Sequence, residues 1–329
     1  MALRKWRLLL RLGAGRDPLA WLPGDQRSDP GLDAPPEFAM IYQQLINGVM
    51  LGASYALVAV GYTLIFGVLN LLYFAHGEVF MVGAFVGLFL VLYAGVGIYG
   101  ALLGAMVACA LLGVVCVVVA VRPVSRANPL APLISTIGLT IVLQNLAVLL
   151  FGGQQVAFPE TITQQLYRLG PVTIGSVQIF ILAVAMALMA LLWLFIEHTK
   201  MGRAIRATAE NHETAALLGV DVNRVVVVTF MIGSGIAGVA GVLDGIKNSS
   251  VSPFMGLTAA VKGLIVMLLG GLGNVPGAMV AGVLLGIIEI LSAAYIGTTE
   301  RDFFSFLILI LILLCRPTGL FGTRTTEER

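Results

Sequence analysis

Residues 79–121 include no charged side chain. Because a helix needs roughly 20 apolar residues to cross the hydrocarbon core of a bilayer, a run of this length predicts two membrane-spanning helices. The glycines in Ala94-Gly95-Val96-Gly97 mark the expected turn between them. The whole chain is 59% hydrophobic and 11% charged, with a mean hydropathy of +0.99, which excludes a water-soluble globular protein.

Similar apolar runs predict an all-α, polytopic integral membrane protein with eight or nine transmembrane helices. The 39 glycines fit this fold class, because membrane helices pack closely through small residues. The last run is the weakest, since only residues 303–315 are continuously apolar. The expected spans are 41–67, 76–94, 98–121, 131–151, 176–196, 225–245, 258–272, 276–296 and 302–316.

Residues 1–39 differ in composition from the rest of the chain. Basic side chains between residues 4 and 16 interrupt every apolar run, which excludes the apolar region of a signal peptide. Residues 17–37 are rich in Pro, Gly and Asp, a composition typical of disorder. We therefore expect residues 1–39 to form a disordered leader, with Met40 as the alternative natural start, and residues 323–329 to form a short tail.

The segment 198–224 is a charged loop between two apolar runs. Short loops that are rich in Lys and Arg stay in the cytoplasm. With nine spans, this loop lies on the same face as the basic residues near position 122 and at the C-terminus, whereas the opposite loops hold only Arg168, Lys247 and Arg301. We therefore expect loop 198–224 and the tail in the cytoplasm. The same count places the start of the first span outside, which conflicts with a basic leader.

Two segments, 67–78 and 269–277, interrupt the helical pattern with an asparagine and at least two glycines each. Backbone without helical hydrogen bonds is tolerated at membrane depth only where protein or a water-filled cavity satisfies it. Paired interruptions are typical of transporters built from inverted repeats. Tight helical hairpins near the bilayer surface are the alternative interpretation.

Five segments resemble the permease subunits of branched-chain amino-acid ABC importers, in particular the shorter of the two permeases that pair in these systems. They follow one another in order between about residues 40 and 322. The segments are Gln44-Leu-Ile-Asn-Gly-Val-Met-Leu-Gly-Ala-Ser-Tyr-Ala-Leu, Gly61-Tyr-Thr-Leu-Ile-Phe-Gly-Val-Leu-Asn with Ala75-His-Gly-Glu, Met201-Gly-Arg-Ala-Ile-Arg-Ala through Leu218-Gly-Val, Leu269-Gly-Gly-Leu-Gly-Asn-Val-Pro-Gly-Ala, and Arg316-Pro-Thr-Gly-Leu-Phe-Gly.

The resemblance implies a permease domain at residues 40–322 with two pseudo-symmetric halves, 41–151 and 225–316, in the bacterial inner membrane. It also implies a second permease that completes a heterodimer, two cytoplasmic ATPase subunits and a periplasmic substrate-binding protein. ATP bound by those subunits would drive alternating access. The chain itself has no P-loop and no His-Glu-x-x-His pattern, so we expect no enzyme activity, cofactor or metal. Its net charge of +2 does not indicate a nucleic-acid partner.

By the same resemblance, segment 198–224 is the coupling loop, whose short helix sits in a groove of the ATPase. Thr199 is the expected cap of this helix, and Gly219 can end it in a left-handed conformation. An ordinary solvated loop is the alternative. The residues expected to couple the two subunits are Gly202, Arg203, Arg206, Glu213, Ala215, Ala216 and Gly219.

Polar residues in or beside the spans are candidates for the translocation path, because ionisable groups there usually face a cavity or a partner. These candidates are Asn70, His76, Glu78, Asn145, Asn274 and Glu289. The alternative for the asparagines and His76 is structural hydrogen bonding. Glu78, Asp244 and Lys262 are interpreted as interfacial groups whose heads reach water, whereas Glu289 fits either interpretation.

The substrate expected on this path is leucine, isoleucine or valine, because an apolar path with few charges suits an aliphatic zwitterion. Urea, short amides or other amino acids are the alternative substrates. A secondary transporter or channel that acts alone is a less favoured interpretation. A membrane-embedded enzyme is disfavoured as well, since the chain has only three histidines.

Overall fold

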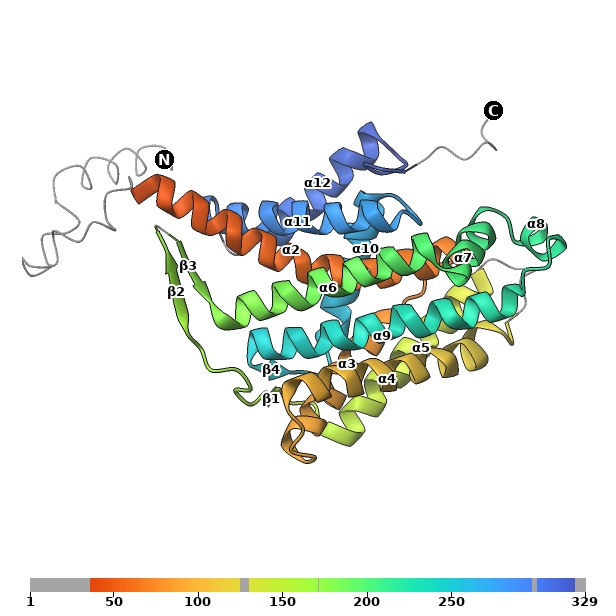
Figure 1. The fold of residues 1–329 in the computed structure, drawn as a ribbon, viewed down its shortest axis with the longest axis horizontal. Helices are drawn as coiled ribbons and strands as arrows, with labels where there is room; N and C mark the ends of the chain where they lie inside the picture. The colour runs from red at the N-terminus through yellow and green to blue at the C-terminus, as the bar shows by residue number, and fades with distance from the viewer. Residues whose placement is uncertain (1–35, 125–129, 171, 298–300, 323–329) are drawn as a thin grey trace, which may run out of the picture.

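The computed structural model describes residues 36–124, 130–170, 172–297 and 301–322 (Figure 1). Within these ranges the chain is predominantly helical, as expected for the all-α class. The first helix begins at Pro36, so only residues 36–39 of the expected leader are described, and they are helical. The rest of the leader and the tail, residues 323–329, lie outside the described residues.

The nine expected spans are found as apolar helices, with ends that differ from the expected ones by a few residues. Six helices are long and apolar enough to cross a membrane, whereas α3, α10 and α12 are shorter. A π-helical turn, Val117–Val121, extends α4. The apolar helices are α2 (Pro36–Leu69), α3 (His76–Leu92), α4 (Ile98–Cys116), α5 (Leu130–Phe151), α6 (Ser176–His198), α9 (Val222–Asn248), α10 (Met255–Gly270), α11 (Val275–Tyr295) and α12 (Arg301–Cys315).

The two ends of the helical bundle differ in structure (Figure 1). At one end, here called the hairpin end, the antiparallel strands β2 (Leu166–Leu169) and β3 (Val172–Gly175) lie beside the start of α2. Strands β1 (Val156–Ala157) and β4 (Ser250–Val251) also pair there. At the opposite end, here called the loop end, lie the short helices α7 (Lys200–Glu210) and α8 (His212–Leu217). These strands are not among the elements expected from the sequence.

The helices form two matched sets, α2 to α5 and α9 to α12. The contact between α2 and α11 corresponds to that between α9 and α4. The contact between α2 and α10 corresponds in the same way to that between α9 and α3. Helices α2 and α9 also contact each other, as do α3 and α10. Because α2 runs from the hairpin end and α9 runs toward it (Figure 1), the two sets are inverted relative to each other. This arrangement confirms the two pseudo-symmetric halves.

The equivalent breaks in the two halves follow α2 and α9. Asn70 has φ 52° and Ser249 has φ 51°, and they are the only non-glycine residues with positive φ in the described ranges. The interruption at 67–78 is therefore confirmed, but its counterpart is the connection 249–254. Segment 269–277 is instead the tight turn between α10 and α11, equivalent to the expected turn at 94–97. The pairing of 67–78 with 269–277 relied on the glycines that both contain. It was wrong because the true counterpart, 249–254, contains no glycine.

Helices α3 and α10 begin inside the bundle, close to each other. A Cβ atom at Gly77 would overlap the backbone carbonyl of Gly256, and one at Gly256 would meet the carbonyl of Gly77 at 2.6 Å. Only glycine permits this approach of the two backbones. The helix starts that follow the two equivalent breaks thus meet on the pseudo-symmetry axis.

Candidate functional site

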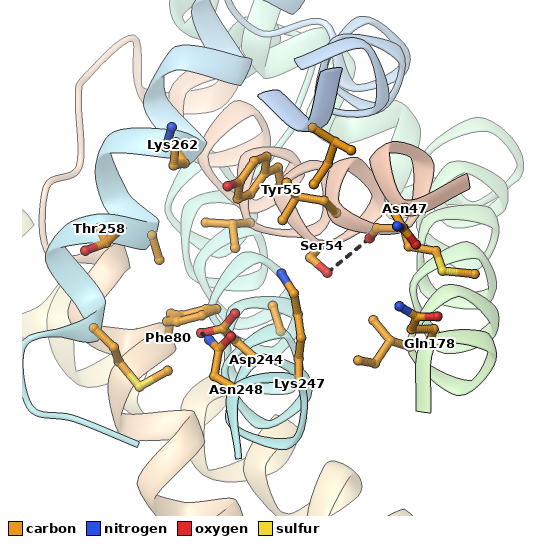
Figure 2. Close-up of a pocket in the computed structure, with 18 residues that line it drawn as sticks. Asn47, Ser54, Tyr55, Phe80, Gln178, Asp244, Lys247, Asn248, Thr258 and Lys262 are labelled. Atoms are coloured by element: carbon orange, nitrogen blue, oxygen red, sulfur yellow. Dashed lines mark hydrogen bonds between the residues drawn. The ribbon is translucent and has the colours of Figure 1, made fainter. Parts of the chain in front are cut away.

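A cavity of about 530 Å³ lies between α2, α6, α9 and α10, toward the hairpin end (Figure 2). Its volume is within the range typical of small-molecule sites. Residues from all four helices line it, together with Phe80 of α3 and Ile290 of α11. The lining residues are Asn47, Met50, Leu51, Ser54, Tyr55, Val58, Phe80, Gln178, Ile181, Ala240, Asp244, Lys247, Asn248, Met255, Thr258, Ala259, Lys262 and Ile290.

Polar groups gather on the part of the cavity nearest the hairpin end. Asn47 near the start of α2 and Gln178 near the start of α6 lie across from Lys247 and Asn248 at the end of α9. This part of α2 is held by Gln43, whose amide donates to Asn47 Oδ1 at 3.2 Å and to the Thr173 carbonyl at 2.9 Å. The deeper part of the cavity is mainly apolar.

Two opposite charges lie on successive turns of α9, on the wall of the cavity. Asp244 accepts a hydrogen bond from the Asn248 amide at 3.0 Å, and Lys247 is close enough for its charge to interact with that of Asp244. Figure 2 shows the side chain of Lys247 extending into the space between α9 and α2. Asp244, interpreted from the sequence as an interfacial group, lies on the wall of this cavity.

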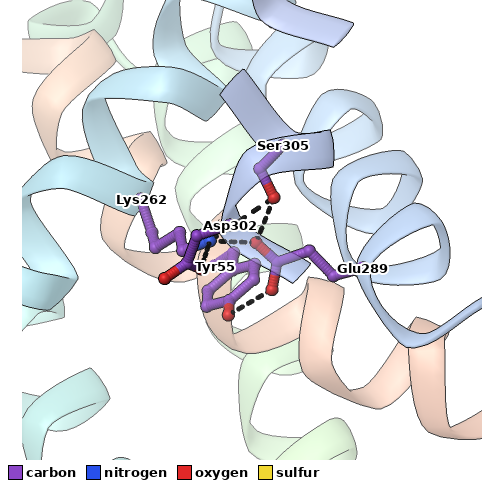
Figure 3. A network of polar contacts seen from close by, with 5 residues as sticks. All are labelled: Tyr55, Lys262, Glu289, Asp302 and Ser305. Carbon is purple, nitrogen blue, oxygen red and sulfur yellow. Dashed lines mark hydrogen bonds and ion pairs between the residues drawn. The ribbon is translucent and has the colours of Figure 1, made fainter. Parts of the chain in front are cut away.

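A buried ion pair lies behind the cavity wall formed by α2 and α10 (Figure 3). Lys262 of α10 pairs with Glu289 of α11, and their side chains are 6% and 0% exposed. Glu289 also accepts hydrogen bonds from the Tyr55 hydroxyl at 2.8 Å and the Ser305 hydroxyl at 2.7 Å. Lys262 contacts Asp302 of α12 at 2.8 Å. The network therefore joins α2, α10, α11 and α12.

Three of the predicted path residues are buried inside the chain. Glu289 belongs to the network just described, whereas His76 and Glu78 lie at the start of α3 and are 0% and 1% exposed. The ring of His76 packs edge-on against Tyr62, with centroids 4.5 Å apart. The interfacial interpretation is wrong for Glu78 and Lys262, because neither head group reaches the surface.

The three predicted asparagines lie at other places. Asn70 is exposed at the break after α2. Asn145 is exposed on α5 and donates to the Ile141 carbonyl at 2.8 Å. Asn274 caps α11 by accepting from Gly277 N at 2.8 Å, and it donates to the Phe321 carbonyl at 2.8 Å. None of the six predicted path residues is among those that line the cavity.

Segment 198–224, the expected coupling loop and here called the coupling segment, forms two short helices with well-defined ends. Thr199 Oγ1 accepts from Gly202 N at 2.9 Å and caps α7, as expected. Asn211 Oδ1 accepts from Thr214 N at 2.8 Å and caps α8. Gly219 has φ 85°, and the following Val220 N donates to the Ala215 carbonyl at 3.0 Å. The left-handed end at Gly219 is as expected, but the single expected helix is interrupted at Asn211 and forms two.

The residues expected to couple the subunits fall into a buried group and an exposed group. Gly202 and Ala215 are buried within the chain. A Cβ atom on Gly202 would overlap the Ile196 carbonyl, so α7 folds tightly against the end of α6. The exposed residues are Arg203, Arg206, Glu213, Ala216 and Gly219. Arg206 forms an ion pair with Glu197 of α6.

Two leucines on the coupling segment were missed by the sequence analysis. Leu217 and Leu218 are 88% and 78% exposed at the end of α8. Exposed neighbouring leucines at the tip of a charged segment are typical of a protein contact. A pattern of two large apolar residues directly before the terminating Gly219 was the available signal.

Comparison with known proteins gives consistent results over most of the chain. Residues 44–315 match the family described as "Branched-chain amino acid transport system / permease component". The chain is 39% identical over 305 residues to the high-affinity branched-chain amino acid transport system permease protein LivH of Escherichia coli, covering 89% of this chain and 99% of LivH. It is 37% identical over 305 residues to BraD of Pseudomonas aeruginosa, a permease protein of the same description, with the same coverage.

A more distant relative comes from an archaeon. The probable branched-chain amino acid transport permease protein LivH of Methanocaldococcus jannaschii is 28% identical over 303 residues, or 87% of this chain and 91% of that protein. No solved structure matches the chain.

Proposed function

The chain belongs to the family of permease components of branched-chain amino acid transport systems, and on that premise we propose that it imports leucine, isoleucine and valine as one permease subunit of an ABC importer. The observation that supports this most directly is its similarity to LivH and BraD along nearly their whole length. The chain is a multi-pass membrane protein. We place it in the bacterial inner membrane, and the charge distribution supports a cytoplasmic position for loop 198–224.

The cavity supports an aliphatic amino acid as the transported solute. Its deep part is lined by Val58, Phe80 and Ala240, which suit an apolar side chain. The polar residues near the hairpin end suit a small charged head group. A solute without an apolar part, such as urea, would leave the deep surface without a partner.

The coupling segment supports ATPase subunits as partners. Helices α7 and α8 project from the loop end (Figure 1), and α8 presents Leu217 and Leu218 to the outside. Helix α7 packs on α2, α6 and α9, which also line the cavity. In this proposal, closure of two cytoplasmic ATPases on ATP moves α7 and α8, and the helices around the cavity alternate between outward and inward access. A second permease and a periplasmic binding protein complete the importer.

The test is reconstitution of the assembled importer in proteoliposomes. The expected result is uptake of radiolabelled leucine that requires ATP on the ATPase side and the binding protein on the other. A matched preparation with a hydrolysis-deficient ATPase is the control. Uptake of leucine by this chain and its permease partner without ATPases would instead establish a secondary transporter or channel. Transport of urea or short amides but not leucine would establish the alternative substrate class.

A further inference from the structure

We propose that the cavity between α2, α6, α9 and α10 recognises both charges of a free α-amino acid, with Lys247 binding the carboxylate and Asp244 binding the ammonium group. The inference rests on the proposed function and deepens it, because it assigns the atoms that distinguish an amino acid from other aliphatic solutes. Neither residue was among the expected path residues.

The charges of the cavity match those of a zwitterion. The charged residues that line it in the described ranges are Asp244, Lys247 and Lys262. The ammonium group of Lys262 is bound by Glu289 and Asp302 on the far side of the wall, as Figure 3 shows. A solute in the cavity therefore meets one carboxylate and one ammonium group. A zwitterion can pair with both, whereas an anion or a cation would pair with one and be repelled by the other.

The spacing of the two groups suits a small head group. Asp244 and Lys247 are three residues apart on α9, so they lie on neighbouring positions of one helix face. The charges on an α-amino acid are separated by a single carbon atom, and such a head group can bridge two side chains at this spacing. The amide of Asn248, which already donates to Asp244, holds the carboxylate in place.

The gradient of polarity in the cavity sets the orientation of the solute. Lys247 and Asn248 lie at the end of α9, nearest the hairpin end, whereas Ala240 lies two turns deeper. Val58 and Phe80 face the same deep region. Head-group contacts on α9 therefore direct an aliphatic side chain toward the centre of the bundle, where the starts of α3 and α10 meet.

The test measures protection of a cysteine in the cavity. Thr258 lines the cavity and is exposed, so Thr258→Cys reports occupancy through its rate of reaction with a maleimide. The exposed Cys315 is replaced by serine, and the buried Cys109 and Cys116 are left in place. The probes are leucine, leucinamide, which lacks the carboxylate, and 4-methylpentanoate, which lacks the ammonium group. The importer is assembled in nanodiscs without the binding protein, so that only the cavity selects.

The expected result is that leucine slows the labelling while the other two probes at the same concentration do not. Lys247→Met or Asp244→Asn should raise the leucine concentration needed for half-protection by roughly tenfold or more, because each loses a hydrogen bond to a charged group. Arg168→Met and Glu160→Gln are the matched controls, since both are exposed residues outside the cavity. These controls should leave the half-protection concentration unchanged.

Three results overturn the inference. They are equal protection by all three probes, protection by leucine that Lys247→Met leaves unchanged, and uptake of leucine without any protection. Because Lys247 is exposed, its replacement is compatible with folding even where Asp244→Asn is not. Uptake of leucine by the wild-type importer is measured in parallel. Uptake without any protection by leucine overturns the site alone, whereas failure to transport any aliphatic amino acid overturns the proposed function.

Discussion

Replacement of Glu289 by glutamine removes a buried negative charge while keeping the shape of the side chain. In the native chain Glu289 is fully buried, pairs with Lys262 and accepts hydrogen bonds from Tyr55 and Ser305. Without it, Lys262 keeps the Ser305 hydroxyl at 3.4 Å and one charged partner in the described residues, Asp302, whose side chain is 65% exposed. Breaking a buried pair by removing one partner costs about 3–5 kcal/mol. Because the contact with Asp302 remains, the expected loss of unfolding free energy is about 3 kcal/mol.

Removal of the other partner, Lys262→Met, should lower the unfolding free energy by a similar amount, because it leaves the carboxylate of Glu289 buried with two neutral donors. The double variant buries no uncompensated charge of this pair, so its loss should be smaller than the sum of the single losses by about 2 kcal/mol. Unfolding in mixed SDS micelles gives the free energies. The reaction of the buried Cys109 and Cys116 with a thiol dye reports the transition.

The exposed pair of Arg206 and Glu197 is the matched control. Their side chains are 43% and 48% exposed, so Arg206→Met and Glu197→Gln should each change the unfolding free energy by less than about 1 kcal/mol. Losses at Lys262 and Glu289 that are equally small, or that simply add in the double variant, would refute the view that this network holds α12 to the bundle.

The remaining predictions concern the coupling segment, the sidedness, the packing of α2 and the leader. Ala216→Arg or Gly219→Leu should uncouple leucine uptake from ATP hydrolysis without preventing membrane insertion, because both change the exposed surface of α8. A cysteine that replaces His212, in a chain without Cys315, should react only with reagents on the cytoplasmic side. Gly286→Leu should destabilise the chain by more than about 1–3 kcal/mol, since a Cβ at this position overlaps the backbone of α2. A chain that starts at Met40 should insert and transport normally.

Each of these has its own control. Ala216→Ser should couple normally, and normal uptake by Ala216→Arg with ATPase co-purified at wild-type yield would disprove the docking role of α8. Labelling at position 212 from outside would reverse the topology. Gly138→Leu is the control for packing, because a Cβ there meets nothing within 4 Å; equal stability of the two leucine variants would contradict the close contact. An inactive Met40 chain would show that the preceding residues are needed.

The spans were predictable because each apolar run is bounded by a polar or glycine-rich segment. The start of α3 at His76 and that of α4 at Ile98 agree with the expected spans. The existence of two symmetric halves was predictable, but which segments of the two halves correspond was not. Asn70 and Ser249 share a left-handed backbone, yet residues 246–255 contain no glycine that would mark the break at Ser249.

The cavity was not predictable from composition, because its residues come from helices far apart in the sequence. Asn47, Gln178 and Lys247 look like ordinary polar residues near helix ends. Only the packing of α2, α6 and α9 places them around one space. The partnership of Lys262 with Glu289 was hidden for the same reason, since 27 residues and a tight turn separate them.

Gly202 fits closely against the carbonyl groups at the end of α6, so the junction of α6 and α7 is rigid. Thr199 reinforces it, because its hydroxyl donates to the Phe195 carbonyl at 2.7 Å while its Oγ1 caps α7. In the proposed importer, a displacement of α7 by the ATPase would therefore be passed to α6 with little bending at their junction. A bulkier residue at position 202 would weaken that junction. A smaller displacement would then reach the helical bundle even if α8 remained docked on its partner.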